Sequence, residues 1–160
     1  MDVEIGLPGQ SREEVGRILN GVLADEHVLY VKTRNYHWNV SGPRFHSLHE
    51  FFEEQYGQLA EAIDDVAERA RALGVRAAGT MTEFKELARL VEEPEVVPSE
   101  DGMLTNLAHD HEALTRQLRA DIKRCEDELE DVGTADFLTG LMETHEKQAW
   151  MLRSFLDRND

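Results

Sequence analysis

Five of the side chains between positions 37 and 68 form a candidate metal-binding set. Two are imidazoles and three are carboxylates: His37, His49, Glu53, Asp64 and Glu68. Both donor types suit iron, manganese or zinc, because they bind borderline divalent ions and leave coordination positions open for an oxidant. The set therefore indicates metal chemistry.

Four of the five residues lie on one segment whose apolar stripe is centred on Phe52. At about 100° per residue, all four fall on one polar strip beside that stripe. They form two i, i+4 pairs, His49 with Glu53 and Asp64 with Glu68. A polar strip of this kind is also the ordinary form of a solvated helix flank, so geometry alone leaves both interpretations open.

The two pairs lie too far apart to hold one ion within one chain. The 15 residues from His49 to Asp64 span roughly 22 Å of helix. Two copies related by a two-fold axis, with these helices antiparallel, would place the His49 end of one against the Asp64 end of the other. The Glu-x-x-His pattern that holds two metals inside many four-helix bundles is absent. The spacing predicts two equivalent sites per dimer, each with ligands from both copies.

The elements that must position these residues are predicted to be four long helices and one short one. Ser11 with Glu14 has the form of a capping box that opens the first helix, which ends near Asn39 before Gly42-Pro43. The second helix runs from about Arg44 to Gly74. A short helix is expected over 82–87.

Pro94 and Pro98 close the crossover that holds the short helix, Ser99 caps the third long helix, and Gly133-Thr134 breaks the chain and caps the fourth. Two hairpins joined by one long crossover have the connectivity of a ferritin-like four-helix bundle. The predicted fold is all-α, with the short extra helix between the second and third long helices. The expected limits are a flexible tail over 1–10, the domain over 11–157 and a C-terminal end over 158–160.

Composition narrows the choice of partners and compartment. Asp and Glu number 33 against 17 Lys and Arg, a formal charge of −16, which repels phosphate backbones and attracts cations. The single cysteine, Cys125, allows no internal disulfide and favours a reducing compartment. The N-terminus lacks the pattern of a secretion signal, and no run of 18 apolar residues is present. A cytoplasmic protein without a membrane span is expected.

Longer motifs carry a family resemblance. The segment N-Y-H-W-N-V-x-G-P-x-F-H-x-L-H-E, continuing to I-D-D-V-A-E-R, resembles the ferroxidase-site segment of the Dps proteins, or miniferritins. The runs L-Y-V-K-T-R-N-Y-H-W and H-E-K-Q-A-W-M-L-R-S-F-L match as well, so the similarity extends from about Ser11 to Asp157.

The resemblance implies a ferroxidase that oxidises Fe(II) to Fe(III) and stores ferric iron inside a hollow homododecameric shell as a protection against oxidative stress. Hydrogen peroxide is the oxidant most typical of the family, and dioxygen is the other candidate. It also implies a two-metal iron site at each two-fold interface, with His37, His49 and Glu53 from one subunit and Asp64 and Glu68 from its partner. The family usually has Asp where Glu53 stands. That change lengthens the carboxylate by one methylene.

Further expectations concern residues around this site. Trp38 resembles the family's site-proximal tryptophan, and interception of oxidising equivalents and simple interface packing both stay open for it. Asp136, and after it Asp131, resemble carboxylates that line acidic three-fold pores. His111 and His145 lie on apolar stripes and are expected to be hydrogen-bonded core residues. DNA compaction, known for relatives with Lys-rich tails, is disfavoured because no basic arm is present.

Overall fold

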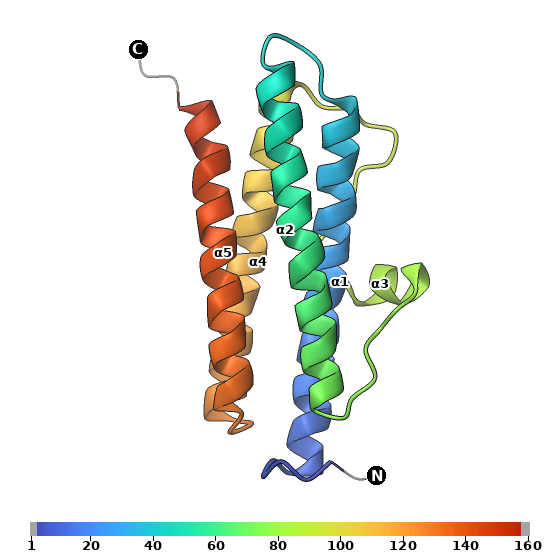
Figure 1. Cartoon of the computed structure of the whole chain (residues 1–160), viewed down its shortest axis with the longest axis vertical. Helices are drawn as coiled ribbons and strands as arrows, with labels where there is room; N and C mark the ends of the chain where they lie inside the picture. The colour runs from blue at the N-terminus through green and yellow to red at the C-terminus, as the bar shows by residue number, and fades with distance from the viewer. Residues whose placement is uncertain (1–2, 158–160) are drawn as a thin grey trace.

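The computed structural model describes residues 3–157, which contain five helices and no strand. Two long antiparallel helices form one hairpin, two more form a second, and a short helix lies in the crossover between the hairpins (Figure 1). Their bounds are α1 Gly9–Asn39, α2 Phe45–Ala72, α3 Met81–Leu87, α4 Glu100–Asp127 and α5 Val132–Leu156. The all-α, ferritin-like prediction with a short helix in the crossover is confirmed. No helix within residues 3–157 has the length and apolar character needed to span a bilayer.

The turn between α1 and α2 fixes how the two helices face each other. Gly42 has a φ of +132°, and the Glu100 carboxylate lies within 2.7 Å of the place where a Cβ would stand. Only glycine fits both the backbone conformation and the space. Arg44 then donates its backbone N–H to the same carboxylate and pairs with Asp101, which ties the turn to the start of α4.

Two helix starts differ from the prediction. Helix α1 begins at Gly9 rather than at Ser11, and Glu14 forms ion pairs with Arg17 and Arg124 instead of completing a capping box. Two residues of the predicted tail, Gly9 and Gln10, are therefore helical, while the predicted C-terminal end at 158–160 lies outside the described residues.

The second difference concerns the start of α5. Asp131 caps this helix by accepting a hydrogen bond from the backbone N–H of Thr134, whereas the sequence pattern had given the capping role to Gly133-Thr134. Aspartate is among the strongest N-cap residues, because its carboxylate satisfies an N–H that has no partner within the helix. The expected helix break is real, but it lies two residues earlier.

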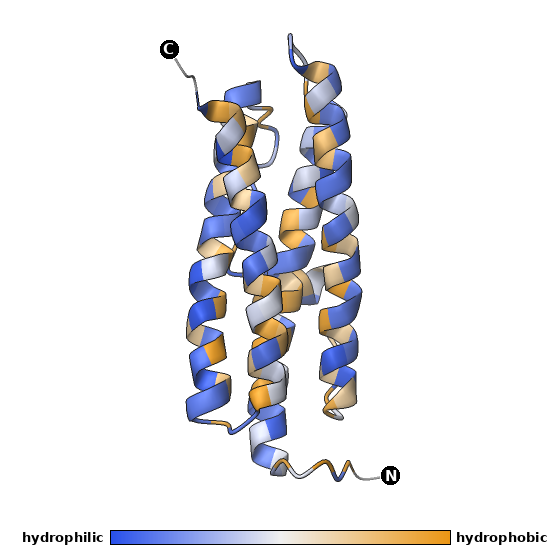
Figure 2. Ribbon diagram, turned by 60° about the vertical axis from the view of Figure 1, so that its left-hand side comes forward, coloured by the Kyte–Doolittle hydropathy of each residue, from blue (hydrophilic) through white to orange (hydrophobic). Residues whose placement is uncertain are grey.

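The core is a set of buried leucines and other apolar residues from the helices. Hydrophobic and hydrophilic residues alternate along each long helix (Figure 2). Crossover residues are held onto this bundle by charge. The buried carboxylate of Asp25 on α1 accepts hydrogen bonds from the backbone and side chain of Arg89, which also pairs with Asp121 on α4. Within the crossover, Phe84 of α3 stacks on His27 of α1, with ring centroids 3.7 Å apart. The crossover is thereby fixed against α1 and α4.

Three of the buried polar side chains form a hydrogen-bonded chain inside the bundle. The Glu26 carboxylate on α1 accepts a hydrogen bond from Nε2 of His145 on α5 at 2.7 Å. The Nδ1 atoms of His145 and His111, on α4, are 2.9 Å apart, so one of them carries the shared proton. All three side chains are at most 1% exposed. The prediction of two hydrogen-bonded core histidines is confirmed, and Glu26 is an additional member.

This buried group predicts that acid destabilises the fold. Burial, and after it the charge of His145, holds the pKa of His111 well below its ordinary value of 6.5. Below pH 6.5 the unfolded chain therefore binds a proton at His111 that the folded chain does not, and stability falls by up to roughly 1.4 kcal/mol per pH unit until the folded pKa is reached.

Thermal unfolding between pH 7.5 and 5.5 would measure this slope. We expect His111→Leu to flatten it, while His109→Leu, at an exposed histidine of the same helix, leaves the slope unchanged. Equal slopes in wild type and His111→Leu would show that the buried histidine does not cause the acid sensitivity.

Candidate metal centre

His37 and His49 meet where the α1–α2 hairpin closes. His37 lies in the last turn of α1 and His49 in the second turn of α2, and their rings stack with centroids 3.8 Å apart. The Nδ1 atom of each ring lies 2.8 Å from the backbone oxygen of the other residue. The hairpin therefore holds the two imidazoles together by a reciprocal pair of hydrogen bonds.

These hydrogen bonds determine which ring nitrogen can bind a metal. A carbonyl oxygen can only accept, so Nδ1 of each histidine carries the proton and donates it. In the neutral imidazole, Nε2 then has a free lone pair. Metal-binding histidines characteristically donate their other N–H to a carbonyl or carboxylate, which fixes the tautomer and the ring orientation. The two rings are thus prepared as Nε2 ligands.

Glu53 lies one helical turn after His49, on the exposed side of α2. Its carboxylate accepts a hydrogen bond from the Tyr56 hydroxyl at 3.3 Å. Tyr56 also directs its ring toward His37, with centroids 5.2 Å apart and planes at 81°. Burial, and after it the Glu53 carboxylate, raises the pKa of Tyr56, which keeps the phenol a hydrogen-bond donor. Three of the five predicted ligands are therefore neighbours.

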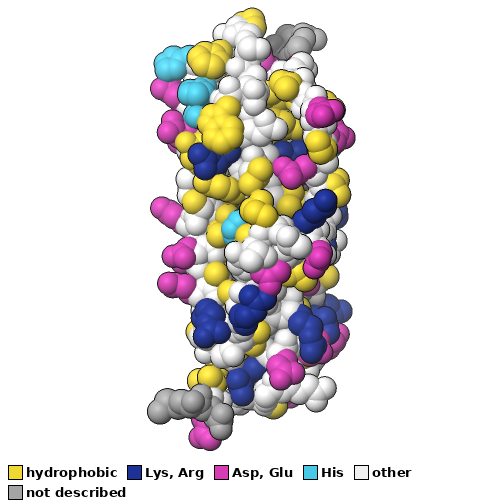
Figure 3. Space-filling model, turned by 90° about the vertical axis from the view of Figure 1, so that its right-hand side faces the viewer, with side chains coloured by type: hydrophobic (Ala, Val, Ile, Leu, Met, Phe, Trp, Pro, Cys, Tyr) yellow, Lys and Arg dark blue, Asp and Glu magenta, His cyan; other side chains and the backbone are white. Residues whose placement is uncertain are grey.

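Asp64 and Glu68 lie farther along α2, which runs without interruption from Phe45 to Ala72. Both carboxylates are exposed, and neither forms a hydrogen bond or an ion pair with another described residue. Figure 3 shows acidic side chains spaced along one edge of the molecule, with histidines gathered near its upper end. A straight helix keeps Asp64 roughly 22 Å from His49. Within one chain the structure does not bring the two pairs together.

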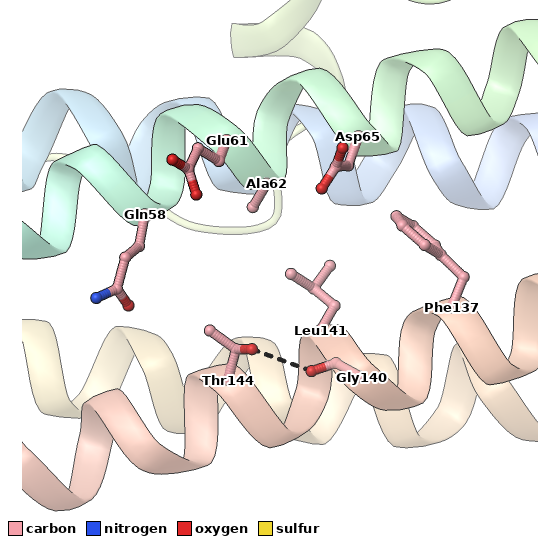
Figure 4. Close-up of a pocket in the computed structure, with 8 residues that line it drawn as sticks. All are labelled: Gln58, Glu61, Ala62, Asp65, Phe137, Gly140, Leu141 and Thr144. Atoms are coloured by element: carbon pink, nitrogen blue, oxygen red, sulfur yellow. Dashed lines mark hydrogen bonds between the residues drawn. The ribbon is translucent and has the colours of Figure 1, made fainter.

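No group of three or more His, Cys, Asp or Glu side chains within residues 3–157 is arranged to hold a metal ion. The acidic cavity nearest to the strip lies between α2 and α5 and has a volume of about 370 Å³ (Figure 4). Its carboxylates belong to Glu61 and Asp65, which face Phe137 and Thr144 across the cavity. They point toward α5 and are separate from the Asp64–Glu68 pair.

Trp38 projects from α1 beside this region and is 63% exposed. The guanidinium of Arg34, one turn earlier, lies 4.8 Å from the centre of its ring. A large exposed indole directly after the predicted ligand His37 is unusual on a monomer surface and is typical of contact residues. Packing and redox roles for Trp38 both remain predictions.

The two predicted pore residues have different surroundings. Asp131 is 2% exposed, since its carboxylate accepts from Thr134 and pairs with Arg69 at 3.2 Å. Within one chain these partners hold the carboxylate at the start of α5, and its part in a pore stays a prediction. Asp136 lies on the exposed side of α5, and its part in the pore likewise stays a prediction.

Tyr56 and Arg34 are residues that spacing did not single out. Tyr56 lies on α2, close to Glu53. Its position three residues after Glu53 is the signal that could have identified it, because side chains at i and i+3 meet on a helix surface. Arg34 lies one helical turn before Trp38, at i−4, and this spacing is the signal that could have identified it.

Comparison with known proteins shows which family this chain is similar to. A family model of the ferritin-like domain matches residues 17–160. A low-temperature-induced protein of Nostoc sp. is 53% identical over 155 residues, which cover 97% of this chain and 87% of the Nostoc protein. DNA protection during starvation protein 2 of Bacillus anthracis is 37% identical over 146 residues, covering 91% of this chain and 99% of that protein.

Solved structures give the same result. The Dps protein of Vibrio cholerae O1, described as a member of a broad superfamily of ferritin-like diiron-carboxylate proteins, superposes with a TM-score of 0.90 at 30% identity, covering 98% of both chains. The family model, the sequence relatives and the solved structures agree. The chain therefore belongs to the Dps family of the ferritin-like superfamily.

Proposed function

We propose that this protein is a ferroxidase and iron store whose catalytic sites form between two subunits. The observation that carries the proposal is the paired-imidazole arrangement, in which both Nδ1 atoms are bound to carbonyl oxygens and both Nε2 atoms are free to bind iron. Asp64 and Glu68 of a partner subunit would supply the remaining carboxylates. Membership in a family of ferritin-like diiron-carboxylate proteins supports iron as the metal.

Each residue has a defined part in this reaction, with Fe(II) as the substrate. His37 and His49 bind and orient the ion through neutral nitrogen donors. The carboxylates of Glu53, Asp64 and Glu68 bring negative charge that stabilises the ferric product more than the ferrous substrate. With hydrogen peroxide as oxidant, two Fe(II) and two protons yield two Fe(III) and two water molecules.

Anaerobic addition of Fe(II) followed by hydrogen peroxide or dioxygen tests this proposal. We expect Fe(III) absorbance to rise faster than in buffer, with about two Fe(II) bound per site before oxidant is added. A rate equal to the buffer control would contradict the ferroxidase assignment. Comparing the two oxidants at equal concentration identifies the preferred one, for which we propose hydrogen peroxide.

The product would be held inside a homododecameric shell, and Asp136 is proposed to line its entry pore. A ring of carboxylates raises the local concentration of cations at a pore mouth. We expect Asp136→Asn to slow the uptake of Fe(II) roughly three- to tenfold without loss of oxidation capacity. Glu13→Gln, at another exposed carboxylate, is the control. Equal uptake by Asp136→Asn and wild type would exclude this residue from the pore.

DNA compaction is the second candidate, since a relative is named a DNA protection protein. A charge of −16 per chain opposes phosphate binding, which depends on Lys and Arg that release counterions. We therefore propose that protection of DNA would be indirect, through removal of iron and oxidant in the cytoplasm. Retardation of DNA by the assembled protein in low salt at neutral pH would favour direct binding instead.

A further inference from the structure

A cluster of aromatic side chains surrounds Arg34 next to the proposed iron site. The guanidinium lies 5.4 Å from the ring centres of both Tyr30 and Tyr56 and 4.8 Å from that of Trp38. It also donates a hydrogen bond to the Tyr30 hydroxyl at 2.9 Å. Tyr30, Arg34 and Trp38 follow one another at four-residue spacing on α1, so one face of this helix presents the cation to Tyr56 of α2. Cation–π contacts of this kind restrain the rings involved.

Tyr56 connects this cluster to two of the proposed ligands. Its ring meets His37 edge to face, and its hydroxyl donates to the Glu53 carboxylate at 3.3 Å. A second tyrosine, Tyr30, meets the Tyr56 ring edge to face, with planes at 90° and centroids 6.0 Å apart. The Tyr56 ring therefore contacts His37, Tyr30 and Arg34, and its hydroxyl lies on Glu53.

Glu53 needs such support more than a shorter side chain would. Its carboxylate is exposed and has one more rotatable bond than an aspartate, so ordering it for metal binding costs additional side-chain entropy. A hydrogen bond from a rigid neighbour reduces that cost, because a tyrosine has only two side-chain torsions. The hydroxyl can bind one carboxylate oxygen and leave the other for the ion.

We propose that Tyr56 is a positioning residue that orients the Glu53 carboxylate beside the paired histidines, and that Arg34 holds Tyr56 in place. This inference rests on the proposed ferroxidase function and deepens it. The resemblance leads us to expect Asp at position 53, and the longer Glu53 of this chain reaches the Tyr56 hydroxyl. Residues that orient ligands typically change metal affinity about 10- to 100-fold when they are removed.

Co(II) binding to the assembled protein, followed by its visible absorption spectrum, tests the proposal. We expect Tyr56→Phe to weaken Co(II) binding about tenfold and to alter the spectrum, because a freed carboxylate changes the ligand geometry. In Fe(II) oxidation the same variant should raise KM about tenfold and change kcat little. Tyr36→Phe is the matched control, since its hydroxyl accepts from Asn106, away from Glu53.

A double-variant cycle separates positioning from general damage to the structure. In the Glu53→Asp background the shorter carboxylate no longer reaches the phenol, so adding Tyr56→Phe should change Co(II) affinity less than about twofold. An unchanged affinity in Tyr56→Phe alone, or an equal loss in both backgrounds, would overturn the proposal while leaving the ferroxidase function intact. Wild-type protein that neither binds Co(II) nor oxidises Fe(II) would overturn both.

Discussion

Replacing His37 and His49 together by alanine is expected to lower the initial rate of Fe(II) oxidation by roughly 100-fold or more. Loss of an outer partner of a metal ligand already costs about 10- to 100-fold, and the double variant removes both nitrogen ligands. The remaining carboxylates bind Fe(II) weakly and without fixed geometry. Stopped-flow absorbance at two Fe(II) per subunit measures the rate.

A suitable control for this variant is His46→Ala. His46 lies one turn before His49, is exposed, and lies 3.7 Å from the carboxylate of Glu50. We expect it to oxidise iron at the wild-type rate. Oxidation near the wild-type rate in the double variant, with assembly and helix content preserved, would place the catalytic ion elsewhere.

Replacing Asp64 by Asn and Glu68 by Gln should reduce oxidation by a similar factor, although these residues lie far from the histidines of their own chain. The two amides keep the size of the side chains and remove two charges that would stabilise the ferric product. The expected loss therefore appears mainly in the oxidation rate and in Fe(II) affinity. Both are measured in the same stopped-flow and anaerobic titration experiments.

The same helix supplies a control with matched chemistry. Glu61→Gln with Asp65→Asn makes an identical change in charge, but these side chains face the cavity between α2 and α5 (Figure 4). We expect that variant to keep the wild-type initial rate. If the two double variants lower the oxidation rate equally, the cause is the general loss of negative charge from α2.

Sequence reasoning predicted the helices well because their signals are local. Apolar spacing and turn residues determined four long helices, and Ser99 caps α4 as expected, accepting from Gly102. The error at the start of α1 arose because no side chain caps that helix, whereas the error at the start of α5 arose where two residues compete for one role. Asp131 and Thr134 can both cap, and the backbone of α5 selects Asp131. Such choices depend on how the preceding helix ends, which residue types alone do not specify.

The site was only partly predictable for a different reason. The strip of ligands on α2 follows from helical periodicity, but the reciprocal hydrogen bonds of His37 and His49 depend on the register of the hairpin. Contacts between segments that are far apart in the sequence produce no regular spacing of residues, so periodicity cannot predict them. Glu26 and His145 are 119 residues apart in sequence, and the apolar stripe around His145 predicted a buried hydrogen bond without identifying Glu26 as its partner.

Mixing two inactive variants tests most directly whether each site is shared between subunits. The His37→Ala/His49→Ala chain retains Asp64 and Glu68, and the Asp64→Asn/Glu68→Gln chain retains both histidines. The two variant proteins are dissociated, mixed in equal amounts and reassembled. Half of the resulting two-fold pairs then contain one chain of each kind, and each such pair has one complete site. About one quarter of the wild-type oxidation rate should therefore return. If reassembled mixtures stay as inactive as the two separate variants, the ligands do not come from neighbouring subunits.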